Sequence, residues 1–476
     1  MASGTRAKWR WMGWAMPAAF ALVGAPSHAI GQVAAPPTPA PAAPAAAPPA
    51  TTATFLALSD IHYVGTANET CGQAGDETDD ALWSAAQAEA QRVIQAERPA
   101  FAIYLGDLPS HCTPHPDSQF TVALDGLANI AGAGTKLIYV PGNNDSLGGD
   151  YYPFADNAGQ TPLDRSTAWG GKPVLNARPG DMIDVSNLSK GYYAAYAAQA
   201  TASAPALRVI ALNTTIFTAK YGQRVPGRQA DSDAQLDWLD AQLKDARAKK
   251  EKVIIAMHVP PGTDGYGGRN GDQIITMWDS GLIYTGQDPD LPPRAWVQQV
   301  FLQLIASYRA EIIGLLSSHT HYNEIRRLRD CSQTPSRMGA FTELDVAIPS
   351  ITTDHGNNPS VKLFGYDGAF EWTENRTYYA PAKSGAGWGG DSTFSFDQDN
   401  YPCPSCAAGS SLYARIATLT AGKATAGKLP GQMLKWLTVG AGPAGSREYL
   451  LAMDATCDIP GANAVSARRM RLRAGR

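Results

Sequence analysis

The sequence predicts an α/β sheet domain, in which short buried strands alternate with amphipathic helices. Six apolar runs have the length of buried strands, and longer segments of helical periodicity lie between them. Such alternation is typical of α/β sheets. No internal repeat of fixed period accompanies the runs. They are residues 55–58, 101–105, 136–140, 207–212, 252–257 and 312–316.

Helices are expected in three segments, residues 81–96, 233–250 and 294–308. Ser232 and Gln235 have capping-box spacing, so we expect the second helix to begin there. Two later apolar runs, residues 346–351 and 361–366, extend the sheet. Beyond residue 367 the periodicity weakens, with helical patterns only at 431–439 and 446–453. Residues 368–476 are therefore expected to form an irregular extension packed on the domain of residues 54–367.

Residues 1–29 have the pattern of a secretory signal peptide. Basic residues precede an apolar run over 11–24, and Ser27-His28-Ala29 gives a small-x-small cleavage site. This run is shorter than the ~20 apolar residues of a membrane span, and no later segment is longer, so no stable membrane insertion is expected. Residues 30–53 are dominated by Ala, Pro and Thr, which is typical of an extended linker. We therefore expect a secreted or periplasmic protein.

Charge and cysteine content add two expectations. A formal net charge of -4 provides no field for a nucleic acid polymer or anionic lipid, so the substrate must be recognised locally.

Six cysteines in an exported chain predict disulfide bonds. We expect one bridge between Cys71 and Cys112. Cys403 and Cys406 have the spacing of a redox or zinc motif, but no helix start follows them, which favours a structural disulfide.

Residues that can bind metals follow five of the predicted strands, where ligand sites gather in open α/β sheets. Packing alone gives no reason to place four of the seven histidines outside the leader at strand ends. Two cations ~4 Å apart could supply a metal-bound hydroxide and neutralise the oxygens of a phosphate ester. Imidazole-rich ligation favours zinc, with iron and manganese as alternatives. In chain order the residues are Asp60, His62, Asp107, Asn143, His258, His319 and His321.

These ordered motifs resemble the calcineurin-like metallophosphoesterase superfamily, whose signature is D-x-H, G-D, G-N-H-D/E, a lone His and G-H-x-H. Within it, residues 106–111 and 349–367 resemble the acid sphingomyelinase and sphingomyelinase-like phosphodiesterase branch. The resemblance covers residues 54–367 and implies a catalytic domain built as a sandwich of two mixed β-sheets flanked by helices. It also implies two metal sites that share Asp107: one with Asp60, His62 and His321, the other with Asn143, His258 and His319.

The chain departs from the family pattern at the proton donor. Asn144 stands where the superfamily has a His that protonates the leaving oxygen. An amide could still bind a phosphate oxygen, but acid assistance, commonly worth ~10²- to 10⁴-fold, is lost or moved. His111 is the best substitute, because the sphingomyelinase-like branch places a His there beside the leaving group. Whether it donates the proton or only orients and packs stays open, and His355 is a weaker candidate. Ser318 replaces the Gly of G-H-x-H, with little effect expected.

The sequence therefore predicts a secreted two-metal phosphodiesterase of the sphingomyelinase-like kind, with a small phosphate ester as its substrate. Only the linker precedes residue 54, so no saposin-like lipid-handling domain is expected there, which favours a soluble diester, nucleotide or phosphorylated head group over sphingomyelin. A phosphomonoesterase or nucleotide pyrophosphatase with the same metal site stays open. So does a metal-stabilised binding protein weakened by Asn144, although the retention of all seven ligands counts against it. The oligomeric state is not predicted.

Overall fold

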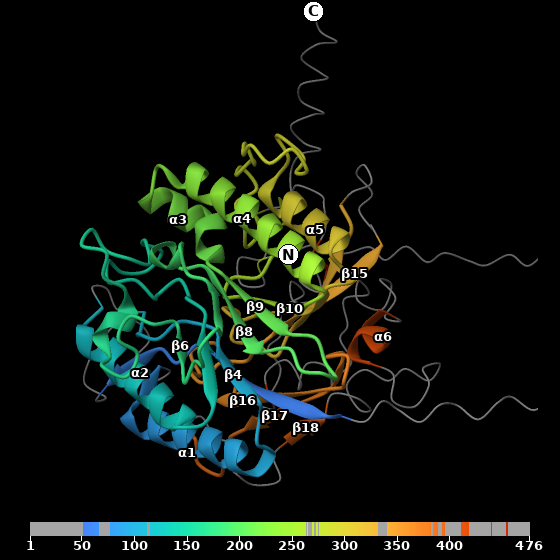
Figure 1. Ribbon diagram of the computed structural model, residues 1–476. Coiled ribbons are helices and arrows are strands. Elements are labelled where there is room, and N and C mark those ends of the chain that lie inside the picture. Colours follow the sequence, from blue (N-terminus) through green and yellow to red (C-terminus); the bar gives the residue numbers. More distant parts are fainter. Residues whose placement is uncertain are drawn as a thin grey trace, which may run out of the picture. The chain divides into compact units, whose positions relative to one another are not determined.

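Two large mixed sheets and the helices around them make up the described part of the chain (Figure 1). The computed structural model describes residues 51–65, 77–111, 115–262, 264, 269–270, 273–274, 276–331, 340–381, 384–388, 393–395, 411–417, 439 and 454–455. Within these ranges, none of the helices combines the length and apolar character that a membrane span requires.

The first sheet has seven strands in the order β18-β17-β16-β1-β4-β5-β6. Its three central parallel strands are β1 (Ala53–Leu58), β4 (Phe101–Tyr104) and β5 (Lys136–Tyr139). Antiparallel strands extend both edges: β6 (Val174–Leu175), β16 (Ser360–Tyr366), β17 (Trp372–Tyr379) and β18 (Thr393–Ser395). Two helices, α1 (Asp80–Glu97) and α2 (Asp117–Ala131), pack on its outer face (Figure 1).

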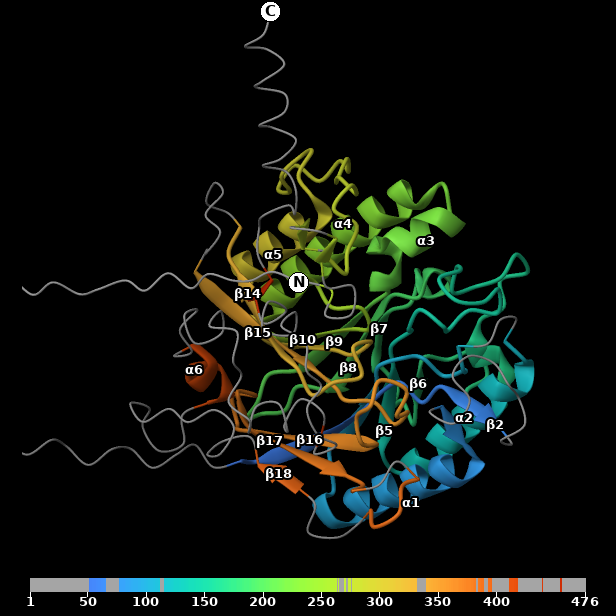
Figure 2. The same cartoon turned by 180° about the vertical axis from the view of Figure 1, so that it is seen from behind.

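The second sheet has eight strands in the order β19-β14-β15-β13-β10-β9-β8-β7. Its parallel strands are β9 (Leu207–Leu212), β10 (Lys252–Met257), β13 (Ile312–Ser317) and β15 (Phe341–Ala347). The remaining strands are β7 (Met182–Asp184), β8 (Tyr193–Ala198), β14 (Ile325–Arg329) and β19 (Asp454–Ala455). Its outer face is covered by α4 (Arg228–Lys249) and α5 (Val297–Ser307), which lie on the opposite side from α1 and α2 (Figure 2).

Short elements connect these layers. They include the two-stranded pairs β2 (Tyr63–Gly65) with β3 (Thr78–Asp79) and β11 (Arg269–Asn270) with β12 (Gln273–Ile274). The short helices are α3 (Ala219–Arg224), α6 (Leu412–Ala417) and the 3₁₀ turns η1 (Pro162–Arg165), η2 (Leu188–Lys190) and η3 (Thr214–Phe217).

The central strands are buried on both faces, which explains their continuous apolar sequences. In β1, Phe55 and Ala57 pack in the core between the two sheets, whereas Leu56 and Leu58 pack against the helices on the outer face. The same alternation holds in β10, where Ile254 points into the core between the sheets. The predicted sandwich of two mixed sheets flanked by helices is confirmed.

Most predicted strands coincide with observed strands within one or two residues, and β9 and β10 match completely. The strand expected over 346–351 was wrong, because β15 begins at Phe341 and ends at Ala347. Its buried residues Glu343 and Asp345 interrupt the apolar sequence by which a buried strand is recognised. The start expected at Ser232 was also wrong. Helix α4 begins at Arg228, and Ser232 lies buried within it.

Several predictions fall outside the described residues. These include most of 431–439 and all of 446–453, so the expected helices there stay predictions. Five of the six cysteines also lie outside, and the expected bridges between Cys71 and Cys112 and between Cys403 and Cys406 remain untested. Cys331, the sixth, is not a free thiol.

Replacing Phe55 should destabilise the sandwich. Its ring is fully buried, with ring centroids 5.0 Å from Phe101 and 4.7 Å from Phe364. Phe55→Ala should therefore lower the free energy of unfolding by about 3–5 kcal/mol in urea denaturation. Val122→Ala on α2, where the side chain is 38% exposed, should change it by about 0.5 kcal/mol or less. Similar losses in both variants would contradict this assignment of the core.

Candidate metal centre

The seven predicted metal ligands meet where strands of both sheets end. Asp60 and His62 follow β1, and Asp107 and Asn143 follow β4 and β5 of the same sheet. From the second sheet, His258 follows β10, and His319 and His321 follow β13. Ligand atoms of Asp60, His62 and His321 lie within 4.8 Å of one another, and so do those of Asp107, His258 and His319. The chain thus brings together two groups of candidate ligands.

Asp107 lies between the two groups. Its Oδ2 is 3.4 Å from His62 Nε2 and 3.2 Å from His258 Nε2. Asn143 belongs to the same centre, since its Oδ1 lies 3.1 Å from His258 Nε2. A carboxylate placed between imidazoles from different sheets has the position expected of a bridging ligand.

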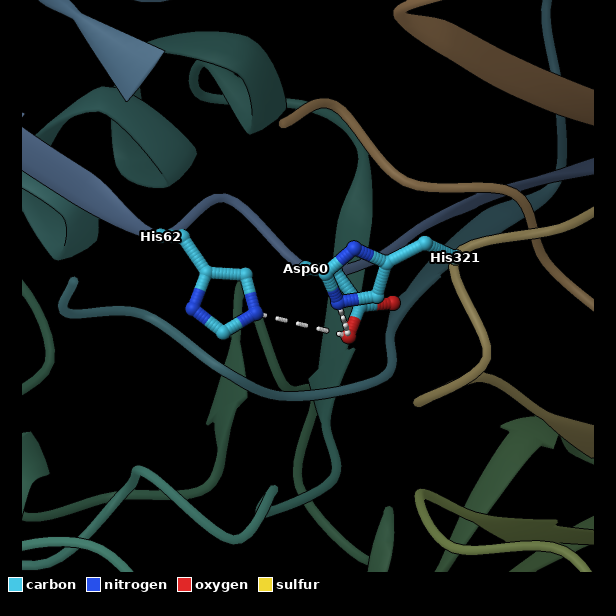
Figure 3. A group of neighbouring side chains, drawn as sticks. All are labelled: Asp60, His62 and His321. Atoms are coloured by element: carbon cyan, nitrogen blue, oxygen red, sulfur yellow. Dashed lines mark ion pairs between the residues drawn. The ribbon is translucent and has the colours of Figure 1, made fainter. Parts of the chain in front are cut away.

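Asp60 shows why the first group suits a cation. Figure 3 shows its carboxylate joined by dashed lines to both His62 and His321, and its Oδ1 lies 3.8 Å and 3.5 Å from their respective Nε2 atoms. The side chain is fully buried, and neither oxygen has a hydrogen-bond partner among the described residues. Nor does His62 Nε2. Buried polar groups are normally satisfied, so these atoms fit a site completed by a metal ion.

The backbone at this centre is strained. Left-handed φ angles are uncommon for residues other than glycine and cost on the order of 1–3 kcal/mol each. Such strain persists only where the surrounding structure imposes it, and it clusters at functional sites. Five of the seven candidate ligands have left-handed φ angles: Asp60 (48°), His62 (45°), Asp107 (64°), His319 (68°) and His321 (60°).

Two glycines allow the loops after β4 and β5 to approach closely. A Cβ on Gly142 would lie 2.1 Å from Asp107 Oδ1, and one on Gly106 would lie 2.3 Å from Gly142 N. Asp145 then joins the loops, because its carboxylate accepts hydrogen bonds from the backbone N–H groups of Asp107 (2.9 Å), Leu108 (2.7 Å) and Gly142 (2.7 Å). Asp145 has no role predicted from the sequence, although it occupies the acidic position of the family signature.

Asn144 faces the bridging carboxylate. Its backbone N–H donates to Asp107 Oδ1 at 2.8 Å, and its Nδ2 donates to Asp107 Oδ2 at 2.9 Å. The side chain is fully buried, and Asn144 does not line the adjoining cavity. In this geometry Asn144 holds Asp107 in place. Its predicted contact with a phosphate oxygen stays a prediction.

Backbone carbonyls orient two of the imidazoles. His62 Nδ1 donates to Pro109 O at 3.1 Å, and His258 Nδ1 donates to Leu105 O at 2.6 Å. Each bond leaves Nε2 for a metal ion, which is the usual arrangement around metal-binding histidines. Ser318 Oγ also donates to Leu105 O at 2.9 Å and lies 2.8 Å from His258 Nδ1. The serine thus adds a contact that the family's glycine lacks.

Burial sets the charge of most of these imidazoles. It lowers the pKa of His62, His319 and His321 well below the ordinary value, so they stay neutral, as metal ligands must be. Burial also opposes charge on His258, but the nearby Asp107 outweighs it and raises the pKa of His258 to about 9. In the metal-free chain His258 and Asp107 therefore form an ion pair, and a bound cation would replace the proton.

A cavity of about 510 Å³ opens onto the centre. Its wall includes four of the candidate ligands, namely Asp107, Asn143, His319 and His321. Polar and charged side chains form much of the remaining wall. They include His111, Asp150, Lys220, Asp264, Asp354 and His355.

The two candidate proton donors lie on different sides of the first ligand group. The ring of His111 stacks on His62, with centroids 4.1 Å apart and planes 11° apart. The ring of His355 packs edge-on against His321, with centroids 4.4 Å apart. Burial opposes charge on His111, but its hydrogen bond to Glu77 outweighs this and raises its pKa above the ordinary value.

A sequence model of calcineurin-like phosphoesterases matches residues 53–323. The chain belongs to the calcineurin-like phosphoesterase family. The human cyclic GMP-AMP phosphodiesterase SMPDL3A is 26% identical over 270 residues, covering 56% of this chain and 53% of that protein. Sphingomyelin phosphodiesterase 2 of Caenorhabditis elegans is 27% identical over 181 residues, covering 37% of this chain and 24% of the relative. A solved dimetal phosphatase from Danio rerio is 14% identical with a TM-score of 0.40, covering 69% of this chain and 96% of that chain.

These relatives confirm the sphingomyelinase-like branch of the family. The predicted class, a metal-dependent phosphoric ester hydrolase, is confirmed at the level of the family. The phosphoesterase spans about half the length of the SMPDL3A proteins that it matches.

Sequence reasoning missed the residues that support the centre of this phosphoesterase. Glu77 bonds to His111 across 34 positions, and Asp150 accepts a hydrogen bond from Asn143 Nδ2 at 2.8 Å. Neither follows a predicted strand directly. The only sequence feature that could have indicated them is an acidic side chain near a ligand motif, and many surface residues have this feature.

Asp150 should matter for metal affinity in the phosphoesterase. Its bond to Nδ2 turns Asn143 Oδ1 toward His258. Asp150→Ala should therefore weaken binding of the second Zn²⁺ by about 10–100-fold in a competition titration with a chelator. Asp117→Ala removes a carboxylate that is 67% exposed and outside the cavity wall, and should leave both affinities unchanged. Equal affinities in the two variants would show that Asp150 does not orient Asn143.

Proposed function

We propose that this chain is an exported two-metal phosphodiesterase that hydrolyses a small, water-soluble phosphodiester. The observation that carries the proposal is the pair of buried ligand groups on either side of Asp107, at the wall of a cavity. When bound, two metal ions would neutralise the phosphate oxygens and activate a water molecule. The donor set of four imidazoles, two carboxylates and one amide favours zinc, with iron or manganese as alternatives.

The cavity supports a soluble substrate. Lys220 and the carboxylates of Asp150, Asp264 and Asp354 line it beyond the candidate ligands. Lys220 Nζ lies 4.8 Å from the centre of the Tyr151 ring, on the wall near His319. These charged side chains suit a polar ester better than lipid tails, and apolar side chains such as Val259 and Met277 line the rest of the wall. The named relatives act on a cyclic dinucleotide and on sphingomyelin, and the wall favours the first kind of substrate.

His111 is the side chain we propose as the proton donor to the leaving oxygen. It lines the cavity, and its side chain is 37% exposed. Nδ1 is bound to Glu77, so Nε2 is the nitrogen left for a substrate. Asn144 is committed to Asp107, which leaves acid assistance to an imidazole outside the ligand set.

Two nitrophenyl esters test the proposed reaction. Loaded with zinc, iron or manganese, the protein should hydrolyse bis-p-nitrophenyl phosphate faster than p-nitrophenyl phosphate. A chelator should abolish turnover, and returning about two equivalents of metal should restore it. Asp60→Asn, which removes a candidate ligand charge, should remain inactive at that loading.

Each other outcome selects a different function. Preference for the monoester would favour a phosphomonoesterase, and preference for a nucleotide anhydride would favour a pyrophosphatase. Two bound metals without turnover of any activated diester would favour a binding protein.

Export belongs to the same proposal and rests on residues 1–29. Intact residues 1–29 in the protein recovered from the host would contradict it.

The role of His111 should depend on the leaving group. His111→Ala should lower kcat by ~10²- to 10⁴-fold on a diester with an alkoxide leaving group, which needs a proton. The loss should be much smaller with p-nitrophenolate, which leaves without one. His355→Ala serves as the control, because it removes the other imidazole of the cavity wall that lies outside the candidate ligand set. An unchanged kcat of His111→Ala on the alkyl diester would rule out the proton-donor role.

A further inference from the structure

We infer that Glu77 is a positioning residue, which holds His111 beside the metal centre so that one ring nitrogen is free for the substrate. The inference rests on the proposed function, and it adds a residue to the site that stands outside every motif of the sequence. Glu77 does not line the cavity and would act only through His111.

Two hydrogen bonds fix His111 to a single oxygen. Glu77 Oε1 accepts from the backbone N–H of His111 at 2.7 Å and from its Nδ1 at 2.7 Å. Since a carboxylate accepts and does not donate, Nδ1 carries the proton in this bond. The bond therefore sets the tautomer and rotation of the ring and leaves Nε2 for the substrate.

His62 fixes the plane of the same ring. The two imidazoles are stacked with centroids 4.1 Å apart and 11° between their planes. His62 is itself held, because its Nδ1 donates to Pro109 O at 3.1 Å. The position of His111 relative to the metal centre is thus determined at one edge by Glu77 and on one face by His62.

A second carboxylate lies farther away. Asp354 Oδ2 is 4.0 Å from His111 Nδ1 and 3.5 Å from His355 Nε2. The Glu77 side chain is 6% exposed, whereas that of Asp354 is 17% exposed. A charge-assisted hydrogen bond at 2.7 Å in a buried setting constrains a ring more strongly than a longer contact near solvent. Glu77 is therefore the main support.

Glu77 is also close enough to His62 and His111 for the three to form a possible cation site. The bond between Glu77 Oε1 and His111 Nδ1 uses two of the atoms available to such an ion, whereas Glu77 Oε2 is buried and has no hydrogen-bond partner among the described residues. Metal content therefore separates a positioning role from a ligand role.

The test combines variants with two leaving groups. Glu77→Gln should lower kcat about 10²-fold on a diester with an alkoxide leaving group, because a neutral amide oxygen holds the ring less firmly than a carboxylate and a small displacement can cost that much. With p-nitrophenolate as the leaving group it should retain most of its kcat. Glu77→Asp keeps a carboxylate and should retain more activity than Glu77→Gln. The double variant with His111→Ala should lose no more than His111→Ala alone, since the two residues act as one unit.

Controls separate positioning from other roles. Glu89→Gln changes a buried glutamate on α1 that is paired with Arg92, so it reports the effect of losing a buried charge elsewhere. Glu77→Gln should bind the same number of Zn²⁺ ions as the unmodified protein. Equal losses with both leaving groups, additive losses in the double variant, or loss of a metal ion would overturn the inference.

The same measurements distinguish failure of the proposed phosphodiesterase function from failure of the positioning role of Glu77. If the unmodified, metal-loaded protein hydrolyses neither diester, the proposed function fails and the inference fails with it. If the unmodified protein hydrolyses both and Glu77→Gln matches it, the positioning role alone is wrong. Asp354→Asn, with the longer contact, should show a smaller effect in the same direction.

Discussion

The carboxylate of Asp107 connects the two halves of the candidate site. On one side it faces His62 from the first sheet, and on the other it faces His258 from the second. Its own position depends on two neighbours: Asn144 donates to both of its oxygens, and Asp145 binds its backbone N–H. The glycines at 106 and 142 are needed because this arrangement leaves no room for a Cβ. The position of the Asp107 carboxylate therefore depends on the backbone geometry and the close packing of the loops after β4 and β5.

The arrangement has an energetic consequence for folding. Strained φ angles and the buried carboxylate of Asp60, which has no hydrogen-bond partner among the described residues, both lower the stability of the folded chain. A metal that binds the folded chain and not the unfolded one adds its binding free energy to stability. Metal binding would thus be coupled to the folding of this domain. The surrounding structure imposes the strained backbone.

The sequence alone predicted the grouping of the candidate metal ligands more directly than it predicted the fold. Each candidate ligand sits in a short motif after an apolar strand, so local spacing was sufficient to name the seven side chains that the fold brings together. The sandwich came from the family resemblance, because periodicity could not distinguish one sheet from two. Strand β14 was missed since Arg326 is buried and pairs with Glu324 at 3.0 Å, which breaks any apolar pattern. Glu77 could not be found because its contact with His111 depends on tertiary structure alone.

The position of the centre between the sheets affects how the domain holds together. No strand of the first sheet pairs with a strand of the second in the described ranges, so apolar side chains provide most of the contact between them. Ions shared by ligands from both sheets would act as a removable cross-link at one end of this interface. The strength of the association between the two sheets would then depend on the metal concentration around the protein, much as a disulfide bond depends on redox conditions.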